Sequence, residues 1–287
     1  MKVAVMADIH SNSVALKSCI EYAKNEGVEA FLFLGDYIGE LAYPQRTMWR
    51  LYELSREYPC YFIRGNKENY WLHYRAGWNV EWRFGSSTTG ILRYDYDRLT
   101  ERDLDFFASL PIARHVKWKG HEGITICHGS PDKINESLKP GSARIREILA
   151  QEESGVVLCA HTHVQFCEEY DGKLLINPGS VGVPLESNGM TQFAILTSED
   201  GKWIPQLISL DYDVERAVAE LYEEKLDKIA PGWTCVTERV LHGCDREHAH
   251  ASSLTKVMEL CREEQGECIW PGIPEEYWNR VLTTTAV

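Results

Sequence analysis

The sequence predicts an α/β protein built as a two-sheet β-sandwich flanked by helices, with a C-terminal helical appendage. Buried strands are indicated by five β-branched or apolar runs that each end in a polar residue: VAVMADIH, FLFLGD, YFIRGN, ITICHG and VVLCAHTH. Three further strands follow at short intervals, KLLINPGS, TQFAILT and WIPQLISL, and they indicate a second sheet packed on the first. A change of composition after residue 210 separates the appendage from the sandwich.

Helices are predicted between these strands from their start and stop signals. Asn12 or Ser13 caps the first helix and Gly27 ends it, which makes a βαβ unit with the strands on either side. Pro44 opens the second helix, and Pro111 closes a shorter one. The expected helices cover residues 13–27, 44–58, 99–110 and 142–152.

The C-terminal part predicts helices that pack on the sandwich. Residues 211–226 place apolar side chains at helical spacing, and Pro231-Gly232 is expected to break the chain. Two more helices are expected at 252–265 and from Pro274 onward. Trp270-Pro271 and Tyr277-Trp278 are expected to dock this part on the core or on a second subunit, so a homo-oligomer stays open. We therefore divide the chain into a domain over residues 1–210 and a helical extension over residues 211–287.

Composition limits the kinds of partner. The 287 residues carry a net charge of −13, and such an acidic chain is a poor candidate for binding long nucleic acid, which needs Lys and Arg to neutralise phosphates. No apolar stretch is long enough to span a bilayer, and the N-terminal apolar run is too short for a signal peptide. The nine cysteines are scattered, which suits a reducing compartment better than a disulfide framework. We expect a cytoplasmic protein with no membrane partner.

Polar residues that follow the strands predict a metal centre. The carboxyl ends of parallel strands meet at one edge of a sheet, so these side chains are expected to converge. Oxygen and nitrogen donors without cysteine, in this number, suit two divalent ions that share a bridging carboxylate. The expected ligands are Asp8, His10, Asp36, Asn66, His128, His161 and His163.

Each of these residues has a commoner explanation when it stands alone. Asp8 follows a strand and is able to cap the next helix. Asp36 and Asn66 follow glycines and suit turns. His161 and His163 flank one residue, so both are able to pack on one side of a strand. The metal site is favoured because the commoner explanations require seven coincidences in order along the chain.

The order DIH, GD, GN, HG and HTH resembles the calcineurin-like metallophosphoesterases. DIHSNSVAL, GDYIGELAYP and NPGSVG also resemble the compact prokaryotic, phosphodiesterase-like branch of that superfamily, over residues 1 to about 210. The resemblance implies a four-layer αββα fold. It also implies that Asp8, His10, Asp36 and His163 hold one metal ion, that Asp36, Asn66, His128 and His161 hold the other, and that Asp36 bridges them.

The resemblance implies a phosphohydrolase, either a phosphodiesterase or a phosphatase. Two metal ions about 3.5–4 Å apart hold a hydroxide, because coordination lowers the pKa of water from about 15.7 to about 7, and this hydroxide attacks phosphorus. The expected ions are Mn, Fe, Zn, Ni or Co, and we favour Mn. The expected substrate is a small phosphorylated molecule or a nucleotide. The alternative is a non-catalytic scaffold that keeps the fold, and a nuclease is disfavoured by the acidic charge.

One residue departs from the family pattern. The family has GNHD or GNHE where this chain has Gly65-Asn66-Lys67-Glu68. Lys67 therefore replaces the histidine that contacts the phosphate, and it is a candidate to bind a phosphate oxygen or to protonate the leaving group. Its pKa is expected to fall beside two cations. The alternatives are an exposed lysine next to Glu68, and His73 as the proton donor.

Aromatic residues are dense between residues 67 and 98. Tyr70, Trp71, Tyr74, Trp78, Trp82, Phe84 and Tyr94 are expected to pack together, and a cap that stacks a planar group is the alternative. Residues 85–90, GSSTTG, are expected to form a flexible loop that gates the site. The histidines and cysteines of the extension lack zinc-knuckle spacing, and His248-Ala249-His250 is expected at the surface.

Overall fold

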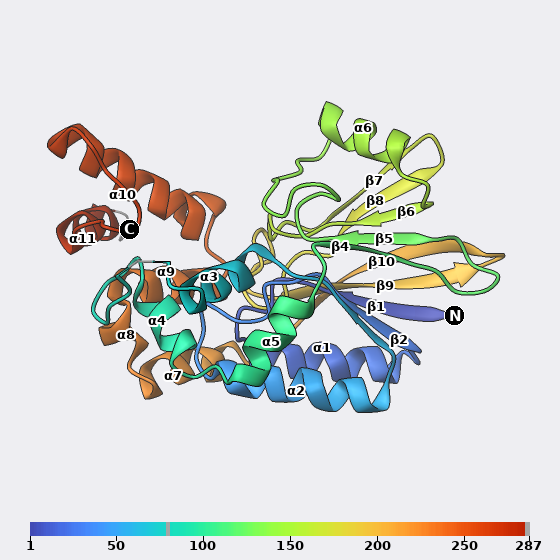
Figure 1. Cartoon of the computed structure of the whole chain (residues 1–287), viewed down its shortest axis with the longest axis horizontal. Coiled ribbons are helices and arrows are strands. Elements are labelled where there is room, and N and C mark those ends of the chain that lie inside the picture. The colour runs from blue at the N-terminus through green and yellow to red at the C-terminus, as the bar shows by residue number, and fades with distance from the viewer. Residues whose placement is uncertain (79–80, 285–287) are drawn as a thin grey trace.

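Two five-stranded sheets lie face to face in the computed structural model, which describes residues 1–78 and 81–284 (Figure 1). The first sheet has parallel central strands and antiparallel strands at one side, in the order β10 (Lys202–Leu210), β9 (Thr191–Glu199), β1 (Lys2–Met6), β2 (Ala30–Phe33) and β3 (Cys60–Phe62). The second sheet has antiparallel edges, in the order β4 (Ala113–Val116), β5 (Ile124–Cys127), β6 (Val156–Leu158), β8 (Lys173–Asn177) and β7 (Phe166–Tyr170). The predicted α/β two-sheet sandwich is confirmed, but the predicted allocation of strands to the sheets is wrong. The donor-bearing strands divide between the sheets, with β5 and β6 beside β8 in the second, whereas β9 and β10 join β1 in the first. Strand pairing between distant segments decides this allocation, and the local pattern of each run does not reveal it.

Alternation along β1 shows how the layers form. Val3 and Val5 face the second sheet, in the cluster of buried side chains between the sheets. Ala4 and Met6 point the other way and pack under the helices. Successive side chains of a strand point to opposite faces, so a strand covered on both faces must be apolar throughout.

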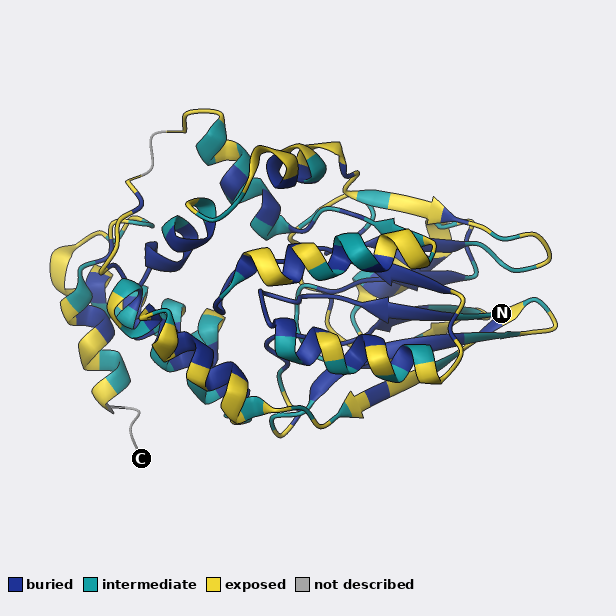
Figure 2. Cartoon of the chain, turned by 90° about the horizontal axis from the view of Figure 1, so that it is seen from below, coloured by how far each residue is buried: buried dark blue, intermediate teal, exposed yellow. Residues whose placement is uncertain are grey.

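Helices cover the outer face of each sheet. Helices α1 (Ser13–Asn25) and α2 (Pro44–Glu57) lie on the first sheet, and α6 (Ala143–Gln151) lies on the second. Figure 2 shows buried residues on the inner sides of α1 and α2 and exposed residues on their outer sides. The predicted ends are confirmed, because Asn12 Oδ1 accepts a hydrogen bond from Ala15 N at 3.0 Å and Pro44 is the first residue of α2.

Two short helices follow β3. Helix α3 (Asn66–Arg75) and helix α4 (Gly90–Tyr96) were not predicted, whereas α5 (Glu101–Ser109) confirms the helix expected at 99–110. The aromatic residues of this region mostly pack, as the favoured interpretation required. Trp71 and Tyr94 are buried, and the rings of Tyr74 and Trp82 stack 4.2 Å apart. Trp78 and Phe84 are exposed, and residues 79–80 lie outside the described part of the chain.

The extension consists of α7 (Val214–Glu223), α8 (Leu226–Ile229), α9 (Pro231–Leu241), a short turn of 3₁₀ helix (Arg246–His248), α10 (His250–Gln265) and α11 (Glu275–Thr284). Pro231-Gly232 does not break the chain as expected but opens α9, because proline is tolerated at the first helical position, where its missing N–H is not needed. Leu221, Val236 and Trp278 are buried in the same cluster as α1 and α2, so the extension packs on the core as predicted. The division at residue 210 stays a prediction.

The gating loop predicted at residues 85–90 is wrong. Its middle residues, 86–89, hereafter the Ser-Thr loop, are all buried. Ser87 donates from both its N–H and its hydroxyl to the Glu275 carboxylate at 2.6 Å, and Trp278 Nε1 donates to Thr88 Oγ1 at 3.1 Å. The loop anchors α11 on the core, because long-range hydrogen bonds that the local sequence does not reveal hold it in place.

Composition also bears on the cysteines and on apolar helices. The nine cysteines are free thiols, and Cys127 and Cys159 are fully buried. Among residues 1–78 and 81–284, no helix is long and apolar enough to cross a bilayer.

Candidate metal centre

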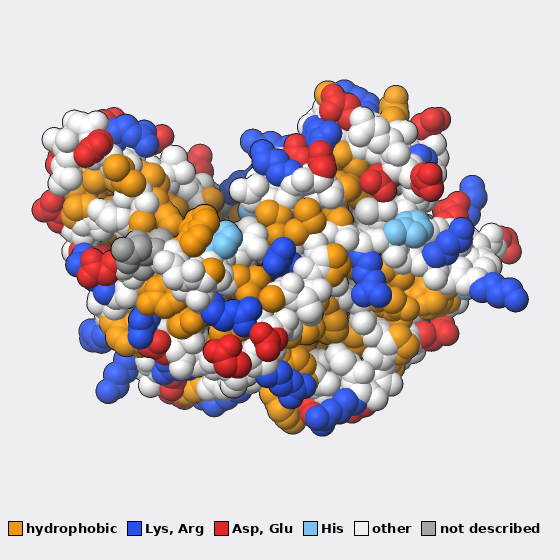
Figure 3. Space-filling model, viewed as in Figure 1, with side chains coloured by type: hydrophobic (Ala, Val, Ile, Leu, Met, Phe, Trp, Pro, Cys, Tyr) orange, Lys and Arg blue, Asp and Glu red, His pale blue; other side chains and the backbone are white. Residues whose placement is uncertain are grey.

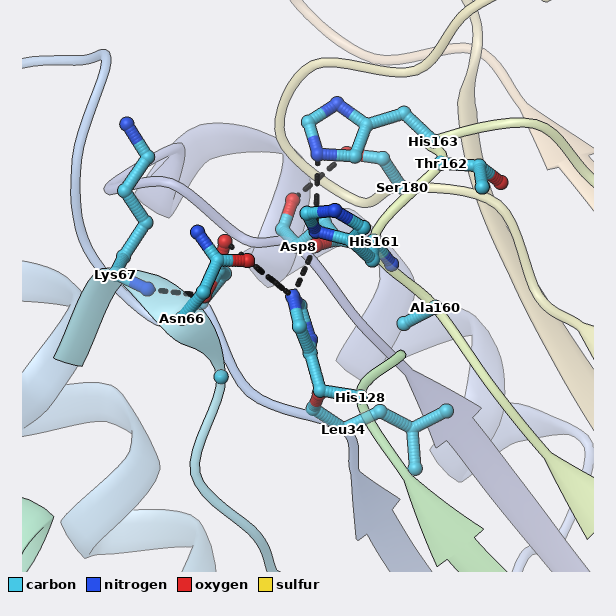
Figure 4. Close-up of polar contacts among 12 residues, drawn as sticks. Asp8, Leu34, Asn66, Lys67, His128, Ala160, His161, Thr162, His163 and Ser180 are labelled. Atoms are coloured by element: carbon cyan, nitrogen blue, oxygen red, sulfur yellow. Dashed lines mark hydrogen bonds and ion pairs between the residues drawn. The ribbon is translucent and has the colours of Figure 1, made fainter. Parts of the chain in front are cut away.

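The seven predicted ligands meet at the carboxyl ends of the strands. Figure 4 shows Asp8, Asn66, His128, His161 and His163 among them. Asp8 and His10 follow β1, Asp36 follows β2, Asn66 follows β3, His128 follows β5, and His161 and His163 follow β6. His10 Nε2 lies 3.2 Å from His163 Nε2, and His128 Nε2 lies 2.9 Å from Asn66 Oδ1. The rings of His128 and His161 have centroids 5.3 Å apart. The predicted convergence is therefore found, although the side chains come from strand ends of two sheets and not of one.

The backbone around these side chains is unusual. Positive φ angles, a region that residues other than glycine seldom adopt, occur at Asp8 (51°), His10 (48°), Asp36 (52°), His161 (67°) and His163 (57°). Each such residue costs about 1–3 kcal/mol and persists only where the surroundings hold it. Backbone hydrogen bonds supply this support, including His10 N to Asp36 O at 3.0 Å and Asp8 N to Gly35 O at 3.2 Å. Strain gathered on five candidate ligands indicates a functional site.

Gly65 permits the closest approach in the centre. A Cβ atom at this position would lie 2.1 Å from Asp36 Oδ1 and 2.5 Å from Asp36 N. No larger residue fits, so the glycine before Asn66 allows the loops after β2 and β3 to touch.

The imidazoles turn their Nε2 atoms toward the middle of the centre. His128 Nδ1 donates to Leu34 O at 2.7 Å, and His163 Nδ1 donates to Val183 O at 3.1 Å. These bonds fix Nδ1 as the donor of each ring, so the neutral imidazole has its lone pair on Nε2, which is how metal-binding histidines are oriented.

The carboxylates complete a cation-binding arrangement. Asp8 Oδ1 is buried without a hydrogen-bond partner among the described residues, and it lies 3.5 Å, 3.8 Å and 3.9 Å from Nε2 of His163, His128 and His10. Asp36 Oδ2 lies 3.8 Å from His10 Nε2 and 3.6 Å from His128 Nε2. A buried carboxylate oxygen costs free energy unless it is paired, and a divalent ion supplies the missing partner. The donor set therefore fits metal ions.

Two groups of three donors stand out within the centre. Asp8, His10 and His163 form one, and Asp8, Asp36 and His128 form the other, with the donor atoms of each group within 4.8 Å of one another. Asp8 belongs to both groups, and Asp36 Oδ2 lies between a histidine of each. Asp8 and Asp36 are thus each placed to offer an oxygen to both donor groups.

The electrostatics of the site favour added positive charge. Burial would raise the pKa of Asp8, but the nearby His163, His128 and His10 lower it well below its usual range, so Asp8 is ionised. Burial and His163 lower the pKa of His10, so its imidazole is neutral. Burial, opposed by His128 and reinforced by Asp8, raises the pKa of Asp36, because two carboxylates in one buried site repel each other. A divalent cation relieves that repulsion.

Lys67 is not the exposed lysine that one alternative expected. Its side chain is 14% exposed, and Nζ lies 2.5 Å from Glu40 Oε1, whose side chain is 4% exposed. Burial alone would lower the pKa of Lys67, but the Glu40 carboxylate outweighs burial and raises it above its usual value. The surrounding protein groups therefore raise the pKa of Lys67, whereas the sequence predicts a fall. The sequence does not reveal the buried carboxylate beside this lysine.

Glu40 joins Lys67 to the C-terminal extension. It is buried with a positive φ of 50°, and Trp233 Nε1 of α9 donates to Oε2. Glu40 Oε1 also lies 3.7 Å from His10 Nδ1, a buried atom without a hydrogen-bond partner in the described part of the chain. One carboxylate thus contacts Lys67, a residue of the extension and the outer side of a candidate ligand.

Two other residues of α3 are Glu68, which the sequence did not single out, and His73, the alternative proton donor. The Glu68 carboxylate is buried and accepts hydrogen bonds from the N–H groups of Gly65, Asp36 and Tyr37 at 2.7, 3.0 and 2.9 Å. It therefore holds the loops after β2 and β3 together. His73 stacks on the exposed Trp78 ring with centroids 4.1 Å apart, at the far end of α3.

Comparison with known proteins identifies the family of the chain. Residues 1–201 match the family described as calcineurin-like phosphoesterase superfamily domain. The chain belongs to this superfamily. The phosphoesterase is 25% identical to the uncharacterized protein MJ0912 of Methanocaldococcus jannaschii over 248 residues, which are 80% of this chain and 94% of that protein.

Solved structures show the same fold. The phosphoesterase superposes on the hypothetical protein PH1004 from Pyrococcus horikoshii OT3 with a TM-score of 0.70 and 21% identity, over 85% of this chain and 99% of that chain. It superposes on a metallophosphoesterase from Sphaerobacter thermophilus with a TM-score of 0.64 and 19% identity, over 80% and 98% of the two chains. Family membership makes the chain a phosphate ester hydrolase of a class that uses divalent metal ions.

Sequence reasoning missed three residues of the phosphoesterase site, and one of them had a local signal. Glu68 lies three positions after Gly65 at the start of α3, which is the spacing of a capping box. Glu40 and Trp233 had none, because the two residues are 193 positions apart in sequence and only the packing of α9 brings them together.

Proposed function

We propose that the protein is a dinuclear metal-dependent phosphohydrolase that acts on a small phosphorylated or nucleotide substrate in the cytoplasm. The ligands in this proposal are Asp8, His10, Asp36, Asn66, His128, His161 and His163, with Mn²⁺ as the favoured ion. The observation that carries it is the buried Asp8 oxygen, which faces three imidazole nitrogens and lacks a partner among the described residues. The free thiols agree with a reducing compartment.

Metal ions held by these residues would activate water and neutralise charge on the phosphoryl group. The protein contributes orientation. The carbonyls of Leu34 and Val183 hold the imidazoles of His128 and His163, and the N–H of Lys67 donates to Asp36 Oδ1 at 2.8 Å, which leaves Oδ2 directed between His10 and His128. This placement supports Asp36 as the bridging ligand.

Lys67 has a binding role in this proposal. Its ammonium group stays charged beside Glu40, so it is suited to hold a phosphate oxygen through a charge-assisted hydrogen bond. A group with a raised pKa is a poor proton donor near neutral pH, because the efficiency of a general acid depends on a pKa near the working pH. Substrates with good leaving groups are therefore favoured.

The test is hydrolysis by the metal-stripped protein after addition of Mn²⁺, Ni²⁺, Zn²⁺ or Mg²⁺. Bis-p-nitrophenyl phosphate and p-nitrophenyl phosphate separate diesterase from monoesterase activity. Asp36→Asn should remove most of the turnover, because the ligand between the two sides loses its charge. Asp171→Asn, a change in the exposed turn between β7 and β8, is the matched control and should keep full activity. Metal binding without turnover for any ion would favour the scaffold alternative instead.

A further inference from the structure

The metal centre opens to solvent through a cavity that the C-terminal extension helps to build. Asp8, His10, Asp36 and His128 are buried, whereas His161 and His163 are half-buried. Both half-buried histidines line a cavity of about 250 Å³. A phosphoryl group at the centre therefore directs its ester substituent into this space.

The cavity has walls from three parts of the chain. The HTH segment forms one wall, and Ser137 and Lys139 of the loop before α6 contribute a second. The third consists of Arg246 and residues 249–252, at the start of α10. Figure 3 shows the hollow between α10 and the lobe that carries α6, with Lys and Arg side chains beside it. Pockets for drug-sized ligands hold about 300–1,000 Å³, so this one suits a small ester substituent.

The charge of the lining is positive although the chain has a net charge of −13. Arg246 and Lys139 are cations, and no Asp or Glu is among the described residues that line the cavity. The nearest carboxylate recorded for Arg246 is Glu186, at 3.7 Å between Nη1 and Oε1, and both side chains are at least half exposed. Such an exposed and long ion pair contributes little, so the guanidinium is available to a ligand.

We propose that this cavity binds the leaving group of a small phosphoester that carries a second anionic group, which Arg246 and Lys139 recognise. The inference rests on the proposed phosphohydrolase function and names its substrate class. A guanidinium matches a carboxylate or a phosphate with two parallel hydrogen bonds, so Arg246 is the main anchor and Lys139 adds charge. The extension thus selects the substrate, whereas the sandwich domain holds the metal ions.

Two esters that differ only in the second anion test the proposal, namely phenyl phosphate and 4-carboxyphenyl phosphate. Arg246→Ala in the Mn²⁺-loaded full chain should lower kcat/KM for the carboxylated ester by about tenfold or more, because a hydrogen bond to a charged group is lost. Phenyl phosphate lacks the second anion and has no such hydrogen bond to lose, so its kcat/KM should change by less than about twofold. Arg246→Lys should restore part of the preference, and Arg262→Ala, an exposed arginine of α10 outside the cavity, should leave both values unchanged. Equal losses for both esters, or no loss, overturn the proposal.

Binding gives a second readout that does not depend on turnover. Isothermal titration of the metal-stripped protein with each ester should show tighter binding of 4-carboxyphenyl phosphate, and Arg246→Ala should abolish the difference. Equal binding of the two esters, or binding of neither, overturns the cavity proposal. A binding preference without hydrolysis by any metal-loaded form refutes the phosphohydrolase function and leaves the cavity proposal standing. The two failures are therefore distinguishable.

Discussion

Replacement of Glu40 by glutamine should destabilise the protein far more than the loss of a surface ion pair. Glu40 and Lys67 lie 2.5 Å apart with side chains 4% and 14% exposed. At an effective dielectric constant of about 20, two charges about 3 Å apart attract by about 5–6 kcal/mol. Desolvation offsets part of this attraction, and removal of one partner of a buried pair costs about 3–5 kcal/mol, because the other charge stays buried alone. Glutamine keeps the volume and an acceptor for Trp233.

The free energy of unfolding of the metal-stripped protein measures this effect, by urea titration followed through tryptophan fluorescence. We expect Glu40→Gln to lose about 3 kcal/mol. Glu57→Gln is the matched control, since Glu57 contacts Lys24 at a similar 2.6 Å but both side chains are more exposed, 58% and 33%. An exposed pair contributes about 0–1 kcal/mol. The double variant Glu40→Gln/Lys67→Met should recover stability relative to Glu40→Gln alone. Equal losses for Glu40→Gln and Glu57→Gln would refute the reasoning.

Three further variants test other parts of the structure. Gly65→Ala should abolish Mn²⁺ binding in a calorimetric titration, because the new methyl group meets Asp36 Oδ1 at 2.1 Å, and an unchanged affinity would contradict this. Burial lowers the pKa of His250 to about 4, so the folded state binds fewer protons than the unfolded state below about pH 6.5. Stability should therefore fall from pH 6.5 toward pH 4, and a His250→Gln variant should show a flatter profile; parallel profiles would be inconsistent with a half-buried histidine that is neutral in the folded state. Glu275→Ala should lose about 2 kcal/mol in urea unfolding, since it removes two charge-assisted hydrogen bonds to the Ser-Thr loop. Glu276→Ala, a change at the exposed neighbouring residue, is the control, and its free energy of unfolding should stay within about 0.5 kcal/mol of that of the parent chain.

The sandwich and the convergence of its candidate ligands were predictable because their signals are local. Each strand of the centre is a short apolar run, and the residue after it is placed by the strand end whatever the rest of the chain does. Asp8 and Asp36, after β1 and β2, illustrate this in the first sheet, since parallel pairing carries them to one edge. His128 and His161, after β5 and β6, do the same in the second sheet, and the packing of the two sheets brings the two pairs together. Helix ends were equally local, as the Asn12 side-chain cap and Pro44 show.

The errors fall where distant segments meet. The GSSTTG segment has the composition of a flexible loop, yet Glu275 and Trp278 hold it from almost two hundred residues away. His250 was expected at the surface, but its ring packs 4.8 Å from Trp233 and Nε2 lies 2.9 Å from Thr237 Oγ1. Nothing in the local pattern of either segment indicates its partner.

The sequence by itself determined the fold class, the order of the strands that carry donors and the chemistry of those donors. These follow from the spacing of apolar residues, the residues that start and end helices, and the donor atoms of the ligands, all of which are properties of a few neighbouring residues. Only the tertiary structure decided the environment of Lys67, the role of Glu40 and the cavity wall from the extension. These depend on which charges and surfaces lie within a few ångströms of each residue in the folded chain. Burial changes the energy of a charged group far more than its neighbours in sequence do.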